Sequence, residues 1–480
     1  MSEETHRKQR ASWSGHIAFV IAAAASAIGL GNLWRFPYLA AQYGGGTFIL
    51  IYLLLVVTLG FTLMVTEIAI GRATRQSQLT AYSKLHRGFG FLGLLGTIIP
   101  ILIVPYYCVI GGWVLKYFGT YLQMAFHPGS EILADPDAFF TGFITAPFAP
   151  FGYALVFILL TASVIVMGVK NGIEKSNLIM MPILFFMAIA ISVYVICLPG
   201  STEGLKYYLV PNLDGFRTAE GNFSLALMGK TILGAMGQMF YSLSLAMGIM
   251  ITYGSYMRQE DSIEKAVRRI EIFDTLIAII AGLMIIPVVY LFAMKTGTPV
   301  KTAMNAGPGL MFKTLPKVFA QFGAAGSWIG AAFFSLVVFA ALTSAISLME
   351  ACVASVCDLL HINRKSATFF TTALVAFLAV FSAIGYGPWS KVTLLKMPFL
   401  DFFDFITNSV LMPIVAALTC IFVGWVLKPK VIEDELTSGG HRFAARGLYT
   451  VMIRYIAPIL IAGILVSQVC QAFQIGKWSI

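Results

Sequence analysis

The fold of this chain is decided by residues 26–37, which read Ser-Ala-Ile-Gly-Leu-Gly-Asn-Leu-Trp-Arg-Phe-Pro. They lie inside an apolar run that begins near Ile17, so we expect them at membrane depth. Gly29 and Gly31 weaken a helix at this point. In hydrocarbon, a broken helix is tolerated only where its freed N–H and C=O groups face protein or a water-filled cavity. The stretch is therefore a candidate binding site, and the alternative is a glycine kink that lets another helix pack closely.

The composition places the rest of the chain in the membrane as well. Of the 480 residues, 58% are hydrophobic and 11% are charged, whereas ordinary soluble domains carry about 25% charged residues. Apolar runs of about 20 residues, each long enough to cross a bilayer, recur throughout. We therefore predict an all-α polytopic membrane protein with a single transmembrane domain over residues 1–480. Its start, residues 1–10, is polar and has no cleavable signal pattern.

The apolar runs predict about eleven transmembrane helices. They cover roughly residues 14–38, 46–71, 92–125, 152–168, 175–198, 223–257, 263–295, 324–360, 366–385, 399–427 and 448–473. With the N-terminus inside, Lys and Arg concentrate in the cytoplasmic connections, beginning with residues 7–10. This bias explains the net charge of +10 without a nucleic-acid partner, and it predicts a multi-pass protein of the cell membrane with a cytoplasmic N-terminus.

A second interrupted segment opens the sixth span. Residues 238–248 read Gln-Met-Phe-Tyr-Ser-Leu-Ser-Leu-Ala-Met-Gly and carry Ser242 and Ser244. The chain then divides into repeat one at about 11–200, repeat two at about 221–430 and an additional helix at about 446–474. Interrupted segments at matching positions of two halves indicate the site of a secondary transporter. Taken alone, the serines are explained more simply by hydrogen bonds to the backbone or across a helix interface.

The eighth span adds two adjacent hydroxyls, Thr343 and Ser344, between small residues. A hard cation such as Na⁺ takes oxygen ligands from hydroxyls and carbonyls. Helix packing explains the same pattern, but three polar, small-residue segments in one chain favour a binding role.

Other motifs narrow the function classes. Ionisable residues inside spans are functional candidates, and they are Glu67, Asp274 and Glu350; for Glu67 and Glu350 we expect structural roles. The six cysteines lie in or beside apolar runs and are predicted to be free. The sequence contains no P-loop, HExxH or nucleophile–His set, so neither ATP hydrolysis nor an enzyme activity is expected.

The first interrupted segment carries a family resemblance. The run Gly29-Leu30-Gly31-Asn32-Leu33-Trp34-Arg35-Phe36-Pro37, followed by Gly44-Gly45-Gly46, resembles the signature of the neurotransmitter:sodium symporter family. Weaker matches follow in order at Pro105-Tyr106-Tyr107, residues 238–248, Asp274-Thr275, Thr343-Ser344 and Asp404. The resemblance covers nearly the whole chain. It implies the leucine-transporter fold, a 5+5 inverted repeat with broken helices 1 and 6, and sodium-coupled symport.

The resemblance implies two sodium sites built from oxygen atoms. The first would use the substrate carboxylate, the carbonyl of Ala27 and the side chains of Asn32, Ser242 and Asp274. The second would use the carbonyls of Ala25, Ile28 and Ala340 with the hydroxyls of Thr343 and Ser344.

The implied substrate site draws on several spans. It consists of Ala27, Gly29, Leu30, Gly31, Ile103, Tyr107, Tyr241, Ser242, Ser244, Met247, Ser344 and Leu348. Tyr107 would bond the substrate carboxylate, and the ring of Tyr241 would form a lid. Two ion pairs would act as gates, Arg35–Asp404 at the outer mouth and Arg10–Asp358 at the inner mouth. Gly172 and Pro182 resemble the helix-unwinding pair of the family's fifth span.

Two departures from the family pattern are informative. Monoamine carriers have Asp at the position of Gly29, whereas Gly29 leaves room for the carboxylate of an amino acid. With Met247 and Leu348 forming an apolar, adaptable pocket, we predict a neutral hydrophobic or aromatic amino acid.

The second departure concerns chloride. Chloride-dependent members have Ser at the position of Ala278, and the family often has Asn at the position of Asp274. The charge of Asp274 can substitute for the anion, so chloride is not expected to be required, although Tyr52 and Gln238 resemble chloride-site residues. Alternatively, Asp274 lies near the cytoplasmic end and pairs with an Arg.

Several functions remain as alternatives to sodium symport. They are a proton-coupled amino-acid carrier of the same fold, an ion channel, a membrane enzyme and a sensor that binds an amino acid without transporting it. The lipid bilayer and a small-molecule amino acid are the expected partners. The sequence leaves open which amino acid is carried, the number of Na⁺ ions and the oligomeric state.

Overall fold

The computed structural model describes residues 10–127, 133–218, 221–305 and 307–473. Residues 1–9, which carry part of the expected cytoplasmic charge, and residue 474, the expected end of the additional helix, lie outside these ranges. Within them, the regular secondary structure is helical, with isolated β-bridges only. The prediction of an all-α chain is confirmed.

Nine continuous helical stretches of the described residues are long and apolar enough to cross a membrane. They correspond to predicted spans two to five and seven to eleven, and run over Gly46–Thr74, Arg87–Phe126, Ala149–Val166, Val169–Ile196, Ile263–Thr296, Ala324–Leu360, Arg364–Ile384, Phe399–Leu427 and Arg446–Cys470. Their α-helical parts are α3 (Gly46–Leu55), α4 (Phe61–Thr74), α6 (Gly90–Phe126), α8 (Ala149–Val166), α9 (Lys175–Ile196), α13 (Ile263–Thr296), α16 (Ala324–Leu360), α17 (Arg364–Ile384), α18 (Phe399–Asp404), α19 (Met412–Ile421), α21 (Arg446–Val451) and α22 (Ala457–Ala472).

The predicted first span is broken. Helix α1 (His16–Ala27) ends two residues before Gly29, and Ile28 adopts an extended backbone with ψ 99°. The chain resumes as η1 (Gly31–Arg35) and α2 (Phe36–Gln42), bent by 54° from α1. The break therefore falls inside the glycine motif, where the sequence predicted it.

The predicted sixth span is broken as well. Helix α11 (Leu225–Ser242) stops at the first serine of the motif, and α12 (Ile249–Ser255) begins after six intervening residues, the last of which is Gly248. Between them, Ser244 and Ala246 have positive φ angles of 53° and 59°, a strained conformation for residues with a side chain. The surrounding structure must hold this loop in place, since the sequence locally disfavours it.

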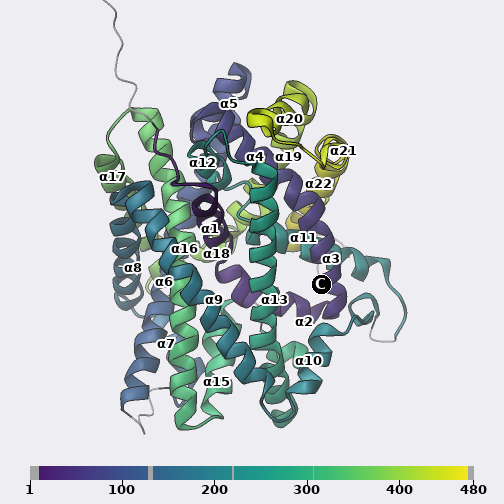
Figure 1. The fold of residues 1–480 in the computed structure, drawn as a ribbon. Helices are drawn as coiled ribbons and strands as arrows, with labels where there is room; N and C mark the ends of the chain where they lie inside the picture. Colours follow the sequence, from purple (N-terminus) through teal and green to yellow (C-terminus); the bar gives the residue numbers. More distant parts are fainter. Residues whose placement is uncertain (1–9, 128–132, 219–220, 306, 474–480) are drawn as a thin grey trace, which may run out of the picture.

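The bundle is arranged around α13 and the first broken span. Figure 1 shows α13 running through the middle, with α6, α8, α16 and α17 on one side and α19 and α22 on the other. Helix α1 packs against α13, α16 and α9. Its residues 22–25 are four consecutive alanines with no exposed surface, and these small side chains let the neighbouring helices approach closely.

Short helices lie at the two ends of the bundle (Figure 1). At one end are α5 (Gln78–Leu85), α12 and α20 (Lys430–Thr437), and at the opposite end are α7 (Pro136–Ile144), α10 (Ser201–Leu209) and α15 (Leu315–Ala320). The remaining short elements are α14 (Val300–Ala303), η2 (Val56–Gly60), η3 (Arg87–Phe89), η4 (Val169–Glu174), η5 (Asp214–Phe216), η6 (Leu310–Thr314), η7 (Phe405–Leu411), η8 (Phe422–Leu427), η9 (Ser438–Gly440) and η10 (Met452–Ile456). The connections that carry α5 and α20 thus lie at the opposite end of the bundle from those that carry α7, α10 and α15, as expected for a chain that crosses the bilayer repeatedly.

Smaller predictions can also be located. Gly172 lies in the π-helical segment η4, and Pro182 lies inside α9, so the fifth span begins with loosened helical pairing. The six cysteines are free, as predicted.

Candidate functional site

The two breaks face each other in the middle of the bundle. Ser244 Oγ donates a hydrogen bond to the carbonyl of Ser26, 3.2 Å away, and Gln238 Nε2 donates to the carbonyl of Gly31 at 3.2 Å. Breaking a helix leaves its last carbonyls and first N–H groups without intrahelical partners. Side chains of the second broken span thus satisfy part of the backbone of the first, which helps to stabilise the first break inside the bundle.

A cavity of about 20 Å³ lies between the breaks, and a space of this size holds about one water molecule. Its lining consists of Ser26, Ala27, Gly29, Leu30, Gly31, Asn32, Ile103, Tyr107, Tyr241, Ser244, Met247, Ile249, Ser344 and Leu348. The structure therefore brings together all the predicted substrate residues except Ser242. A bound amino acid requires the lining side chains to move outward from these positions.

Three lining residues were not among the predicted substrate residues, although Asn32 was predicted as a sodium ligand. Ser26 and Asn32 belong to the first motif, and their places on either side of the break were the signal that could have found them. Ile249 is the first residue of α12 and faces the cavity because the second break ends immediately before it. That position depends on where the break ends, which the sequence locates only within a few residues.

The glycines of the motif are required by close contacts. A Cβ atom on Gly29 would lie 2.6 Å from Ser344 Oγ and 3.1 Å from the Tyr107 hydroxyl, and one on Gly31 would overlap the ring of Tyr241. The hydroxyl of Tyr107 lies 3.5 Å from the backbone nitrogen of Leu30. Glycine thus brings backbone, hydroxyls and the Tyr241 ring together around the cavity.

Ser242 belongs to a neighbouring polar cluster around Asp274. Asn32 Nδ2 donates to Asp274 Oδ1 at 2.8 Å and to Ser242 Oγ at 2.9 Å. Ser242 Oγ and the Tyr52 hydroxyl donate to Asp274 Oδ2, each at 3.0 Å. All four side chains are buried. The alternative in which Asp274 pairs with an Arg is wrong, because its described partners are these three polar side chains.

The donor atoms of both predicted sodium sites are oxygens, which suits a hard cation. In the first set, Asn32, Ser242 and Asp274 are in mutual contact, and Ala27 lines the adjoining cavity. In the second set, Ser344 Oγ lies 3.1 Å from the carbonyl of Ser26 and 3.3 Å from that of Ile28.

The rest of the second set lies close by. Thr343 Oγ1 lies 3.0 Å from the carbonyl of Ala340. Ala25 is fully buried in the last turn of α1. The oxygen donors shown in contact, which are Asn32, Ser242 and Asp274 at the first place and Ser344 with two carbonyls at the second, have the chemistry that suits sodium.

A larger cavity of about 410 Å³ lies on the other side of Tyr241, whose side chain lines both cavities. Arg35 and Asp404 both line it, but they form no ion pair in the part of the chain that the structure describes. Instead, the Arg35 guanidinium lies 5.8 Å from the centre of the Tyr241 ring, and Asp404 accepts a hydrogen bond of 2.6 Å from Asn408. The two residues of the predicted outer pair thus line the same cavity but do not form an ion pair among the described residues.

The end of the bundle that was predicted to be the inner mouth is closed by contacts from the N-terminal segment. Arg10 and Asp358 form the predicted ion pair at 2.6 Å, and Arg10 Nε donates to Ser255 Oγ at 2.9 Å. The Trp13 side chain has no exposed surface and donates to the carbonyl of Tyr253 at 3.1 Å. Burial alone lowers the pKa of Arg10, but the nearby Tyr256 and Asp358 outweigh it and raise the pKa.

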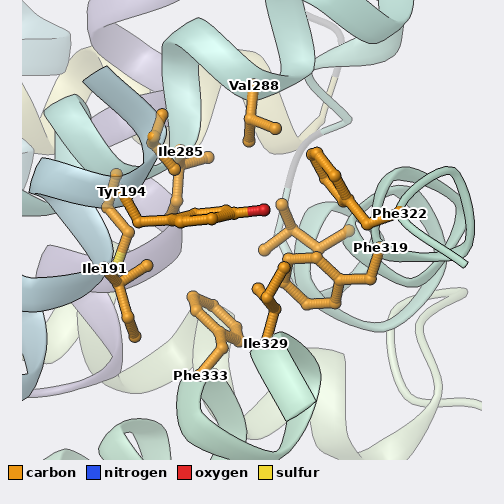
Figure 2. A pocket seen from close by; sticks show the side chains of 11 residues that line it. Ile191, Tyr194, Ile285, Val288, Phe319, Phe322, Ile329 and Phe333 are labelled. Atoms are coloured by element: carbon orange, nitrogen blue, oxygen red, sulfur yellow. The ribbon is translucent and has the colours of Figure 1, made fainter. Parts of the chain in front are cut away.

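A separate apolar cleft lies between α9, α13, α15 and α16 (Figure 2). Figure 2 shows isoleucine, valine and phenylalanine side chains around it, with the hydroxyl of Tyr194 pointing inward. Its volume is about 10 Å³, and no charged residue lines it. This cleft lacks the polar groups that an amino acid or an ion requires.

Comparison with known proteins agrees with this geometry. A model of the sodium:neurotransmitter symporter family matches residues 10–129 and 150–478. The uncharacterized sodium-dependent transporter YhdH of Bacillus subtilis is 34% identical over 94% of this chain and 95% of its own. An uncharacterized sodium-dependent transporter of Haemophilus influenzae is 30% identical over 97% of this chain and 99% of its own.

A solved structure agrees as well. The crystal structure of MhsT in complex with L-phenylalanine superposes with a TM-score of 0.82 and 33% identity, covering 96% of this chain and 100% of that one. The predicted family, the polytopic fold with broken helices 1 and 6, and the assignment as a sodium-dependent membrane transporter all agree with these matches. The chain belongs to the sodium:neurotransmitter symporter family.

Proposed function

We propose that this protein is a sodium-coupled symporter that takes up a neutral hydrophobic or aromatic amino acid by alternating access. The observation that carries the proposal is the meeting of two broken helices around one cavity, with oxygen donors beside it. Helix ends of this kind supply partial charges for a zwitterion and bare carbonyls for a cation.

The cavity has a polar side and an apolar side. On the polar side, the Leu30 backbone nitrogen and the Tyr107 hydroxyl are suited to hold a carboxylate. On the apolar side, Ile103, Met247 and Leu348 offer an adaptable wall for a hydrophobic or aromatic side chain. A relative of this fold, MhsT, was solved in complex with L-phenylalanine, which supports the same substrate class here.

The two oxygen clusters support two sodium ions. Bound there, the ions supply positive charge beside the substrate carboxylate and couple its uptake to the sodium gradient. The carboxylate of Asp274, held by Asn32, Ser242 and Tyr52, supplies fixed negative charge at the first cluster. This charge supports transport that does not require chloride.

The two mouths of the protein support an alternating-access cycle. Substrate and Na⁺ enter from the outer cavity past Tyr241, and closure brings Arg35 to Asp404. Release of the Arg10–Asp358 pair and loosening near Pro182 then open the inner side. In this cycle the N-terminus is cytoplasmic, the protein lies in the cell membrane, and the two repeats at about 11–200 and 221–430 move against each other within one domain.

Uptake into proteoliposomes tests the proposal. Purified protein is reconstituted, and uptake of labelled phenylalanine, leucine, tryptophan, glycine and lysine is measured with an inward gradient of Na⁺, of K⁺ or of protons. We expect saturable uptake of the neutral hydrophobic amino acids with Na⁺ only. Uptake driven by protons alone supports the proton-coupled alternative, and Na⁺-dependent binding without uptake supports the sensor.

A further inference from the structure

A glutamine outside the cavity lies directly behind its wall. Gln78 is the first residue of α5 and is 2% exposed. Its carboxamide is inserted between α6 and the start of α12: a Cβ atom on Gly96 would overlap its nitrogen, and one on Gly248 would overlap its oxygen. The absence of side chains on these two glycines is therefore what makes room for Gln78.

The contact with Gly248 falls at a sensitive point of the chain. Gly248 ends the second break with a φ of 76°, a conformation that residues with a side chain rarely adopt. Its neighbours on both sides, Met247 and Ile249, line the cavity. The oxygen of the Gln78 carboxamide has no hydrogen-bond partner among the described residues. Gln78 thus supports this wall by filling space rather than by bonding to it.

The other end of the same connection reaches the inner mouth. The backbone N–H of Ser77, the residue before Gln78, donates to Asp358 Oδ2 at 2.6 Å. The other oxygen of Asp358 pairs with Arg10 at 2.6 Å. Two consecutive residues therefore join the inner ion pair to the backbone that carries Met247 and Ile249.

We propose that Gln78 is a positioning residue for the amino-acid cavity, which sets the place of the Met247–Ile249 wall and links it to the inner ion pair. The inference rests on the proposed function, because the wall is that of the proposed amino-acid site. Removing the side chain leaves a gap behind Gly248, and the wall can then retreat and admit a larger substrate. When the Arg10–Asp358 pair opens, Ser77 shifts, and the support that Gln78 gives to the Met247–Ile249 wall is lost.

The first test is selectivity. In Gln78→Ala, we expect the ratio of the apparent affinities for a large and a small neutral amino acid, tryptophan and alanine, to shift about two- to thirtyfold towards tryptophan. A residue needed only for folding would lower the maximal rate for both substrates equally. Gln78→Met fills the same space without hydrogen-bonding groups and should restore the wild-type ratio. Gln76→Ala is the matched control, because it removes a carboxamide that bonds Thr80 and does not touch Gly248.

The second test addresses the contact itself. Gly96→Ala places a methyl group against the Gln78 carboxamide and pushes it out of position. We expect this variant to shift the tryptophan-to-alanine ratio in the wild-type background but not in the Gln78→Ala background. Such non-additivity marks a direct interaction. If Gln78→Ala does not fold, Gly96→Ala with an unchanged ratio overturns the proposal by itself.

The third test addresses the link to the inner mouth. Asp358→Asn removes the acceptor charge shared by Arg10 and Ser77. We expect it to change the substrate affinity of the wild type by about two- to thirtyfold, and to have a smaller effect when Gln78 is Ala. Equal effects in both backgrounds overturn the link.

The wild-type measurement separates this inference from the proposed function. Sodium-dependent binding of tryptophan and alanine is measured first by isothermal titration in detergent. If the wild type binds no amino acid, the proposed function fails. If it binds both and Gln78→Ala leaves their ratio unchanged, the role of Gln78 fails while the proposed function stands.

Discussion

At the scale of single residues, Asp274 shows how one carboxylate can organise a site. It accepts hydrogen bonds from Asn32, Ser242 and Tyr52 and has no exposed surface. A buried charge is costly unless it is paired and hydrogen-bonded. Three donors offset part of this cost, and a sodium ion at the same cluster would offset more. A negatively charged Asp274 is therefore compatible with burial at this site.

Replacing Asp274 by Asn removes that charge with little change in shape. Because the fixed anion is lost, we expect uptake in chloride-free buffer to fall about tenfold or more. Initial rates of labelled amino-acid uptake with gluconate in place of chloride provide the measurement. Glu271→Gln, one helical turn earlier in α13, is the matched control and should keep its uptake. Full activity of Asp274→Asn without chloride would refute the idea that Asp274 replaces the anion.

The hydroxyls of α16 allow a second prediction at this scale. Thr343→Ala combined with Ser344→Ala removes two oxygens of the second sodium cluster, so we expect the Na⁺ concentration for half-maximal uptake to rise about tenfold. The measurement is uptake as a function of Na⁺ at fixed ionic strength. Ser355→Ala removes a hydroxyl of the same helix whose partner among the described residues is the Ala351 carbonyl, and it serves as the control. An unaltered Na⁺ dependence would remove this site from the mechanism.

At the scale of elements, the two mouths are built differently. The mouth that we propose to be the inner one is closed by the N-terminal segment, which is held by Asp358, Ser255 and Tyr253. The outer mouth keeps a cavity of about 410 Å³ between η1, α11 and α18, with Arg35 and Asp404 on its walls. Contacts that close one end while the other stays open are what a carrier needs, since two open ends would make a channel.

The outer pair is tested by Asp404→Ala. Closure should be impaired while the substrate site below Tyr241 is unchanged, so we expect uptake to fall about tenfold and equilibrium binding to change much less. Uptake in proteoliposomes and binding in detergent are compared on the same preparation. Asp401→Asn, on the wall of the same cavity and bonded to Tyr386, is the control. Unchanged uptake would argue against an outer gate at Asp404.

At the scale of the whole molecule, the two broken spans bring the proposed ion sites and the proposed substrate site next to each other. The two breaks are in contact, and side chains of the second donate hydrogen bonds to carbonyls of the first. Unbroken helices would satisfy their backbone internally and leave no site for an ion. Because the small cavity and both oxygen clusters contact the first break, occupancy of one site would change the surroundings of the others.

This coupling predicts electrogenic transport. Two Na⁺ ions entering with a zwitterion carry two charges, worth roughly 4–5 kcal/mol at about −100 mV. We therefore expect an inside-negative potassium diffusion potential to raise accumulation of the amino acid in proteoliposomes, and an inside-positive potential to lower it. Liposomes without protein are the control. Accumulation that does not respond to voltage would exclude uncompensated entry of two charges.

Much of this architecture was determined by the sequence alone. Apolar runs predicted the membrane spans because a bilayer requires about 20 apolar residues per helix. Both breaks were marked by residue types that weaken a helix whatever surrounds it. They are the glycines at positions 29 and 31 and the serines at positions 242 and 244. The residues around the cavity could be named because the motif resembles a known family over nearly the whole chain.

The tertiary structure decided what depends on contacts between distant segments. Asp274 could have paired with an Arg, and only packing placed it against Tyr52 from the second span. Arg10 forms an ion pair with Asp358, whereas Arg35 and Asp404 line the same cavity without forming one among the described residues. In the sequence, Gln78 is an ordinary polar residue after the second span, but in the fold its side chain lies behind the cavity wall. Hydrophobicity and helix propensity are local properties, whereas the partner of a polar side chain depends on which segments the fold brings together.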